Sequence, residues 1–116
     1  MTALRRTDTI SGFVRLGRPA EFDRALLVVA LHDVTYVDAP SRIVAERVYQ
    51  RISGHRDEIP FRLSLPENLP VSASYALKAE IRRSARAALR AGDYLSTAAH
   101  PWSPGETSAV IVVQQI

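Results

Sequence analysis

Residues Leu31–Glu46 of this chain read LHDVTYVDAPSRIVAE. The segment begins as an alternating apolar run, is interrupted by Asp33, Asp38 and Pro40, and resumes as a second alternating run. Aspartate and proline favour turns, because a carboxylate accepts hydrogen bonds from nearby backbone N–H groups and proline presets φ. Turn residues between two runs of period two are typical of a β-hairpin. The stretch therefore predicts a chain built from strands.

Apolar residues at every second position extend this pattern along the chain. Seven strands are predicted, over Thr9–Leu16, Ala25–His32, Arg42–Arg51, Ile59–Leu65, Tyr75–Ile81, Arg82–Ala91 and Thr107–Val113. Short strands separated by turn residues at roughly 10–15-residue spacing are typical of an antiparallel sandwich. We therefore expect an all-β fold: a single seven-strand antiparallel β-sandwich of immunoglobulin- or transthyretin-like type over residues 9–116, after a flexible tail at residues 1–8. The predicted core comprises Leu27, Val29, Leu31, Phe61, Leu63, Leu77, Ile81, Ile111 and Val113.

Three features refine this expectation. Ala25–His32 is apolar on both faces, which predicts a central strand covered at least in part on both sides. Pro60 marks the start of its strand or places that strand at a sheet edge. Arg82–Ala91 is rich in good helix formers, but ten residues are marginal for an isolated helix and the preceding strand needs a partner. We favour a strand there, with a helix as the alternative.

Composition limits the classes to which the protein can belong. The chain has 116 residues, 47% of them hydrophobic, enough for one domain with a buried core. It contains no cysteine, which excludes disulfides, thiolate catalysis, cysteine-ligated zinc and lipid attachment at an N-terminal cysteine. No apolar run approaches the roughly 18 residues that span a bilayer, and no signal-peptide pattern is present. We expect either a cytoplasmic protein or one whose leader has been removed.

Residues suited to catalysis or metal binding are few and scattered. Asp33 and Asp38 could ligate a hard cation with Thr35 and Asp23, but carboxylates around a turn are more typical of Asx turns. The three histidines lack metal-binding spacing, and a general base at His32 is the weaker interpretation of a strand-end residue. No nucleophile elbow or glycine-rich phosphate loop occurs, so we expect no catalytic residue, no metal and no cofactor. The turn residues expected to be structural are Asp33, Asp38 and Pro40.

A run of arginines followed by aromatic residues is the best binding candidate. The residues are Arg82, Arg83, Arg86, Arg90, Tyr94 and Trp102. Guanidinium groups neutralise phosphates and aromatic rings stack on bases, so this set would suit an anionic ligand or a nucleic acid. The alternative is that Trp102 caps one end of the sandwich while the arginines form a solvated strand face. We favour this structural interpretation, because the net charge is a modest +3 and no RNA-binding motif is present.

The order and spacing of the pieces also resemble a known family. The matching segments are Ile10–Gly12, Leu31–Thr35, Asp38–Pro40, Ile43–Glu46, Ile59–Pro66 and Tyr75–Arg82. Over residues 9–116 they resemble the YbaY/YscW-type lipoprotein family, which includes type III secretion pilotins. The resemblance implies a small β-sandwich, tethered by lipid to a bacterial envelope and without enzymatic activity. It also implies, for the pilotin branch, a role in the assembly of outer-membrane secretins.

Together these observations give one functional expectation and one alternative. We expect a non-catalytic binding or assembly-assisting domain that engages a peptide or protein segment, such as part of a secretin-type envelope protein, at a sheet edge or groove. By the resemblance, its location would be the cell envelope or periplasm. The alternative is a binder of an anionic ligand or nucleic acid through Arg82–Arg90. Neither the oligomeric state nor the partner follows from the sequence.

Overall fold

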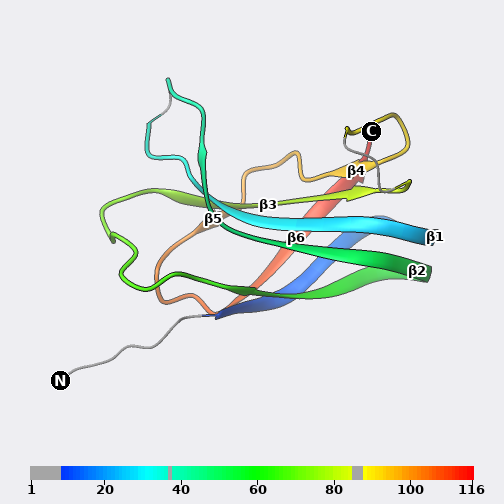
Figure 1. Ribbon diagram of the computed structural model, residues 1–116, viewed down its shortest axis with the longest axis horizontal. Helices are drawn as coiled ribbons and strands as arrows, with labels where there is room; N and C mark the ends of the chain where they lie inside the picture. Colours follow the sequence, from blue (N-terminus) through cyan, green and yellow to red (C-terminus); the bar gives the residue numbers. More distant parts are fainter. Residues whose placement is uncertain (1–8, 37, 85–87) are drawn as a thin grey trace.

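The computed structural model describes residues 9–36, 38–84 and 88–116. Every regular element within these ranges is a strand, which confirms the all-β prediction (Figure 1). The strands are β1 (Thr9–Asp33), β2 (Arg42–Ser64), β3 (Tyr75–Arg82), β4 (Tyr94–Leu95), β5 (Pro101–Trp102) and β6 (Ser108–Gln115). The tail predicted for residues 1–8 lies outside the described residues.

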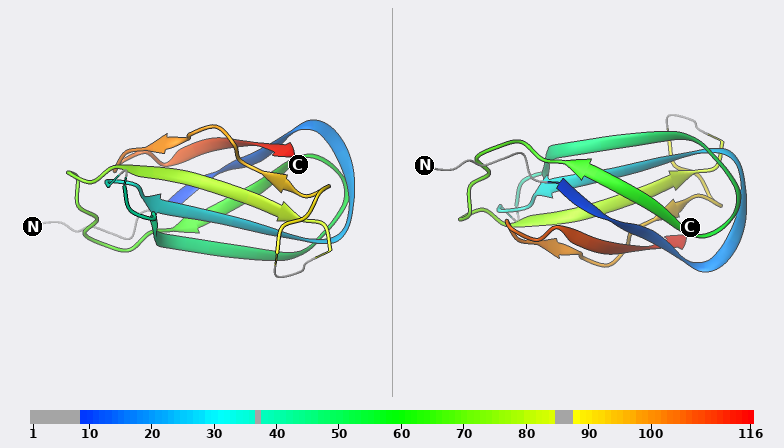
Figure 2. Two further views of the ribbon diagram at one scale, coloured as in Figure 1. Left: turned by 90° about the horizontal axis from the view of Figure 1, so that it is seen from above. Right: turned by 90° about the horizontal axis from the view of Figure 1, so that it is seen from below.

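Two long strands, β1 and β2, form a bent ladder that organises the fold. They pair antiparallel, with Thr9 opposite Ser64 at one end and Asp33 opposite Arg42 at the other. The register shifts between residues 15 and 20 and again around residue 25, as expected of β-bulges. Both strands turn back on themselves there, at one end of the molecule, as Figure 2 shows.

The bend brings the two halves of β1 against different neighbours. Residues Ser11–Leu16 pair in parallel with β6, whereas Leu26–Asp33 pair antiparallel with β3. Strand β4 joins β3 to β6, so the sheet closes on itself as a small barrel. Gly12 permits the close approach of β6, because a Cβ atom at this position would lie 1.7 Å from the carbonyl oxygen of Ala109.

The predicted seven-strand antiparallel sandwich of immunoglobulin- or transthyretin-like type is not confirmed. The strands predicted over Thr9–Leu16 and Ala25–His32 are the two halves of β1, and those over Arg42–Arg51 and Ile59–Leu65 are the two halves of β2. The connecting segments contain glycine, proline and charged residues that suggested loops, but bulges keep them extended and largely paired. In addition, the pairing of β1 with β6 is parallel.

The strand predicted over Arg82–Ala91 is absent from the described part of that segment. Strand β3 ends at Arg82, the next two residues lie in a turn, and residues 88–92 belong to no strand or helix. Residues 85–87 lie outside the described residues. Asp93 provides the physical reason, because its carboxylate accepts hydrogen bonds of 2.8 Å from the backbone N–H groups of Arg83 and Arg90. These bonds hold the segment as a loop, and β4 pairs with β3 in its place.

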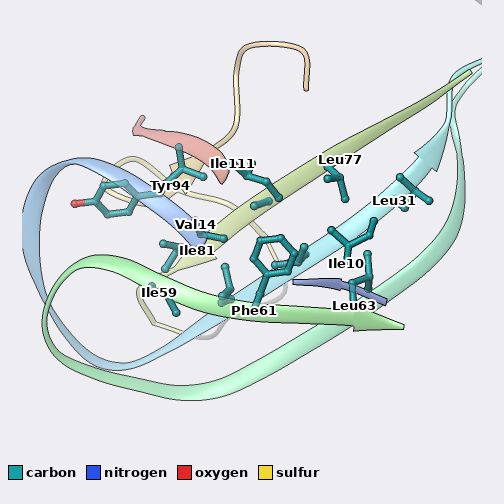
Figure 3. Close-up of a cluster of buried hydrophobic side chains, with 14 of the residues drawn as sticks. Ile10, Val14, Leu31, Ile59, Phe61, Leu63, Leu77, Ile81, Tyr94 and Ile111 are labelled. Carbon is teal, nitrogen blue, oxygen red and sulfur yellow. The ribbon is translucent and has the colours of Figure 1, made fainter. Parts of the chain in front are cut away.

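Alternating apolar side chains fill the interior of the barrel. All nine residues predicted for the core are buried: Leu27, Val29, Leu31, Phe61, Leu63, Leu77, Ile81, Ile111 and Val113. Ile10, Val14 and Ile59 pack among them (Figure 3). Pro60 lies in β2, which among the described strands pairs with β1 alone, so the prediction of an edge position is confirmed.

Candidate functional site

The two aromatic residues of the predicted binding set lie in the core, far from each other. Trp102 is 3% exposed, packs edge-on against Tyr75 with ring centroids 5.6 Å apart, and donates a hydrogen bond from Nε1 to the carbonyl oxygen of Glu106. Tyr94 is buried against Phe22 in the same edge-on geometry. Trp102 pairs with the first residue of β3, whereas Tyr94 pairs with its penultimate residue. Neither ring offers an open face on which a base could stack.

The arginines of that set do gather at the end of β3, but each has a different environment. The Nε atom of Arg82 contacts Oε2 of Glu80 at 2.5 Å. Arg83 donates to the carbonyl oxygen of Glu21 and lies over the ring of Phe22, 5.2 Å from its centroid. The side chain of Arg90 is exposed. Arg86 lies outside the described residues.

Asp93 is a structural residue that the sequence analysis missed. It is a buried carboxylate, 4% exposed, and it binds both ends of the loop that follows β3. Its carbonyl oxygen also accepts a hydrogen bond of 2.8 Å from the backbone N–H of Ile116, which fixes the C-terminus to the same loop. The Gly92-Asp93 pair after a polar segment was the available signal, since both residues favour turns.

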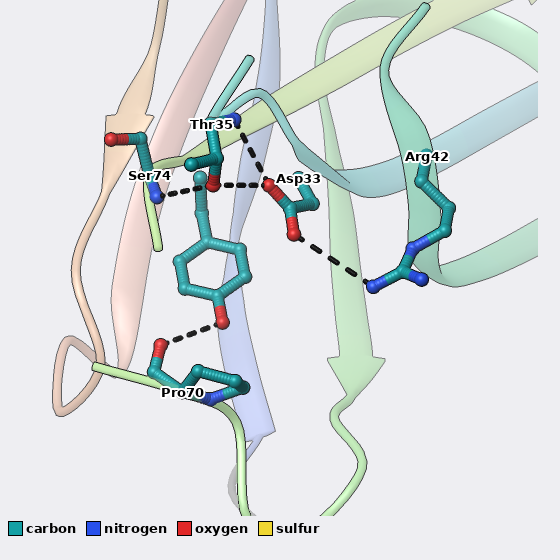
Figure 4. Close-up of polar contacts among 6 residues, drawn as sticks. Asp33, Thr35, Arg42, Pro70 and Ser74 are labelled. Carbon is teal, nitrogen blue, oxygen red and sulfur yellow. Dashed lines mark hydrogen bonds and ion pairs between the residues drawn. The ribbon is translucent and has the colours of Figure 1, made fainter. Parts of the chain in front are cut away.

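Asp33 closes an Asx turn at the end of β1 (Figure 4). Its Oδ1 atom accepts hydrogen bonds from the hydroxyl of Thr35 at 2.5 Å and from the Thr35 backbone N–H at 2.9 Å. The hydroxyl of Thr35 in turn accepts a bond from the backbone N–H of Ser74. The bonds from Thr35 and the more distant Arg42 lower the pKa of Asp33 against the opposing effect of desolvation.

The remaining polar candidates do not assemble into a reactive or metal-binding site. Asp38 and Pro40 are exposed in the loop beyond this turn. His32 shares a hydrogen bond of 2.9 Å between its Nδ1 and the hydroxyl of Ser41, and burial, with Lys78 nearby, lowers its pKa. Over residues 9–36, 38–84 and 88–116, no group of three or more histidine, aspartate or glutamate side chains could hold a metal ion.

An open groove on the outer face of β1, β2 and β3 is the main candidate site. The groove has a volume of about 460 Å³, and Leu26, Val28 and Ala30 of β1 form its floor. The wall from β2 carries Ile43 and Val48, which are 52% and 45% exposed. The remaining lining residues are His32, Glu46, Lys78, Ala79, Glu80, Arg82 and Leu95.

The groove explains why β1 is apolar on both faces. Its inward side chains, such as Leu27 and Val29, fill the core, whereas the alternate ones face the groove. The partial cover predicted for the second face is present, since Ala30 is buried and Leu26 and Val28 are partly buried. The run of apolar residues on both faces of Ala25–His32 was the sequence signal for this site. Which of the two faces lines a groove could not be deduced from it, because that depends on which face the barrel leaves open.

Charged groups line the rim of the groove on both walls. On the β3 side, Arg82 and Glu80 form an ion pair, which leaves Lys78 as the net charge of that wall. Glu46 stands on the β2 side. An apolar floor between walls of opposite charge suits an amphipathic partner in a defined orientation.

A second apolar depression lies on the opposite layer of the barrel. It is more open and has a volume of about 690 Å³, and its apolar lining includes Phe13, Pro60 and Val110. Arg62 is the one charged residue among its lining residues. With a single charged group, this surface has less to orient a partner than the β1–β2–β3 groove.

Comparisons with known proteins identify a family and a shared fold. The sequence profile of one family, described as "Type III secretion system lipoprotein chaperone (YscW)", matches residues 5–100. The structure is similar to that of an alternative pilotin from the type II secretion system of Vibrio cholerae, with a TM-score of 0.76 and 18% identity over 96% of this chain and 98% of the pilotin. That likeness shows a shared fold. No curated protein sequence matches the chain significantly, and the described residues contain no helix suited to crossing a membrane.

Proposed function

This chain belongs to the family of type III secretion system lipoprotein chaperones (YscW), and on this premise we propose that it assists assembly of an envelope secretion complex. It does so without catalysis, by holding an amphipathic segment of a secretin-type protein in the β1–β2–β3 groove. The proposal places the protein at the bacterial cell envelope. The open apolar floor of the groove is the observation that carries the proposal.

The dimensions of the groove favour a helical segment. Its floor follows β1 from Leu26 to His32, which is a length of about 20 Å for an extended strand. A helix of about 13 residues covers that length and presents apolar side chains at positions i, i+3, i+4 and i+7 along one stripe. The exposed Ile43 and Val48 flank such a stripe on the β2 side.

Strand addition at the free edge of β2 has less support. In the second half of β2, the backbone N–H and carbonyl groups of Arg62 are both hydrogen-bonded to the hydroxyl of Tyr49, at 2.8 and 2.9 Å. Pro60, two residues earlier on the same edge, has no N–H group. In the first half, Glu46 and Arg47 place charges along the edge, a feature that discourages edge pairing.

The polar groups near the groove support binding rather than catalysis. The contact between His32 and Ser41 has the composition of a nucleophile–base pair. However, no carboxylate among the described residues is hydrogen-bonded to the His32 ring, and a lowered pKa weakens the ring as a base. Holding a partner requires the apolar floor and the charged rim alone.

The test replaces the two exposed wall residues in an Ile43→Ser/Val48→Ser double variant. Each side chain is about half exposed, so burying both against a partner contributes about 2 kcal/mol, and their loss weakens binding about 30-fold. Calorimetric titration with the secretin subunit of the same organism measures the affinity. Co-expression of the two proteins measures the fraction of subunit recovered as assembled multimer, which is expected to fall.

A Phe13→Ser/Val112→Ser double variant is the matched control. These side chains are 43% and 50% exposed, on the opposite layer of the barrel, so the variant removes comparable apolar surface from outside the groove. We expect it to bind the secretin subunit as the parent does. Equal loss in both variants, or no loss in the groove variant, would refute the assignment of the groove.

A further inference from the structure

The two ends of the molecule differ in their content of arginine. The bend of β1 and β2, the loop after β3 and the C-terminus lie at one end, away from the start of β1 (Figures 1 and 2). This end, which we call the basic end, carries six arginines among the described residues: Arg18, Arg24, Arg51, Arg56, Arg83 and Arg90. The described residues of the loops at the other end, 34–41, 65–74 and 96–107, carry the acids Asp38, Glu67 and Glu106 and neither lysine nor arginine.

Most guanidinium groups of the basic end are open to a partner. In the part of the chain that the structure describes, the side chains of Arg18, Arg24, Arg51 and Arg90 make no hydrogen bond or ion pair. Two of these residues are held through the backbone: the N–H of Arg24 donates to the hydroxyl of Ser53, and that of Arg90 donates to Asp93. The scaffold is therefore held in place while the charges point outward.

Two of these arginines also occupy an unfavourable backbone conformation. Arg24 has a φ of 59° and Arg51 a φ of 61°, in the left-handed region that glycine adopts without a steric penalty. The two residues immediately precede Ala25 and Ile52, which pair across the bend. An arginine at these positions thus strains the backbone where glycine would not. Such strain is expected where the side chain is needed for binding.

The groove opens onto the basic end. Its floor and wall end at Leu26 and Arg82, which lie two residues after Arg24 and one residue before Arg83. A segment that lies in the groove and continues past this mouth therefore meets the unpaired guanidinium groups. We infer that the basic end binds an acidic stretch adjoining the apolar segment held in the groove, an inference that rests on the proposed function for the placement of that segment.

The arrangement of charges favours an acidic polypeptide over an anionic membrane. The carboxylates of Glu21, Asp23 and Asp57 lie among the arginines, which reduces the net field that would attract a charged bilayer. Among the exposed large apolar side chains of the described residues, Ile116 alone lies at this end, so there is little to insert into lipid. Individual guanidinium groups, however, bind carboxylates in bidentate geometry and can select them one by one.

The experiment uses a fluorescein-labelled oligoglutamate peptide and an Arg24→Gly/Arg51→Gly double variant. We expect the parent protein to bind the peptide, with affinity that falls as salt rises from about 0.05 to 0.5 M. The variant is expected to bind about 2- to 30-fold more weakly, because two exposed ion pairs are lost. Its melting temperature is expected to equal or exceed that of the parent, because glycine relieves the backbone strain at both positions. Fluorescence anisotropy measures binding, and circular dichroism measures melting.

An Arg42→Ala/Arg62→Ala variant removes the same charge from outside the basic end and is expected to bind the peptide within about twofold of the parent. Equal weakening in both double variants, or affinity unaffected by salt, would overturn the inference. The inference would also be overturned if the protein bound phosphatidylglycerol vesicles but not oligoglutamate, and if the Arg24→Gly/Arg51→Gly variant bound these vesicles more weakly. The Ile43→Ser/Val48→Ser variant separates the two proposals, because it should retain oligoglutamate binding. If secretin assembly is undiminished in that variant, the assignment of the groove is refuted, whereas binding of acidic peptide by the basic end is unaffected.

Discussion

Replacement of Asp93 by alanine is expected to destabilise the protein by about 3–5 kcal/mol. The buried carboxylate accepts two hydrogen bonds of 2.8 Å, from the backbone N–H groups of Arg83 and Arg90. A hydrogen bond to a charged acceptor contributes about 1.5–3 kcal/mol, and water reaching the exposed loop recovers part of the loss. Because a domain is stable by about 5–15 kcal/mol in total, the variant should lose a large fraction of its free energy of unfolding.

Urea unfolding followed by circular dichroism measures this loss. With a slope of about 2 kcal/mol per M, the midpoint should fall by about 2 M while the slope stays unchanged. The Asp93→Asn variant keeps one acceptor oxygen and should lose about half as much free energy. Asp23→Ala is the control, since Asp23 is an exposed acid and should change stability by less than about 0.5 kcal/mol. A loss below about 1 kcal/mol for Asp93→Ala would refute the view that this carboxylate holds the loop after β3.

Two further predictions concern the barrel itself. Gly12→Ala should lower the free energy of unfolding by about 2–4 kcal/mol, because the added Cβ would lie 1.7 Å from the Ala109 carbonyl oxygen and β6 must move away from β1. An unfolding midpoint equal to that of the parent would contradict this prediction. Because the pKa of Asp33 is lowered on folding, this carboxylate should stabilise the folded state at pH values above 3.8, the ordinary pKa of an aspartate. The contribution should disappear as the pH falls through the lower pKa of the folded state. Melting temperatures between about pH 2 and 6 should therefore fall less steeply in acid for Asp33→Ala than for the parent, and parallel curves would show that Asp33 is not involved.

Local pattern was sufficient to predict strands and core. The alternation of Phe61, Leu63 and Leu65 and of Tyr75, Leu77 and Ile81 places these side chains on one face wherever the strand lies. Turn chemistry at Asp33 was equally local, because an Asx turn forms between residues two positions apart. The resemblance to the lipoprotein chaperone family, carried by the order of short segments, is confirmed by the family match.

The candidate site was predicted less well, because its parts are distant in sequence. Tyr94 and Trp102 follow the arginines along the chain, but β3 separates them in space and the core buries both. The basic end combines arginines from the bend of β1 and β2 with those after β3, a combination that requires the bend. Sequence spacing alone could not reveal that Arg24 and Arg83 share one end of the molecule.

By itself the sequence determined that the chain forms strands, which side chains face the interior and that a turn follows Asp33, since each depends on residues close together along the chain. The tertiary structure alone decided that predicted neighbours such as Thr9–Leu16 and Ala25–His32 form one bent strand, that β6 joins it in parallel, and that the sheet closes. Closure fixes which face of β1 is buried and which remains open. The groove is thus a consequence of long-range pairing, which the period-two pattern of the sequence cannot encode.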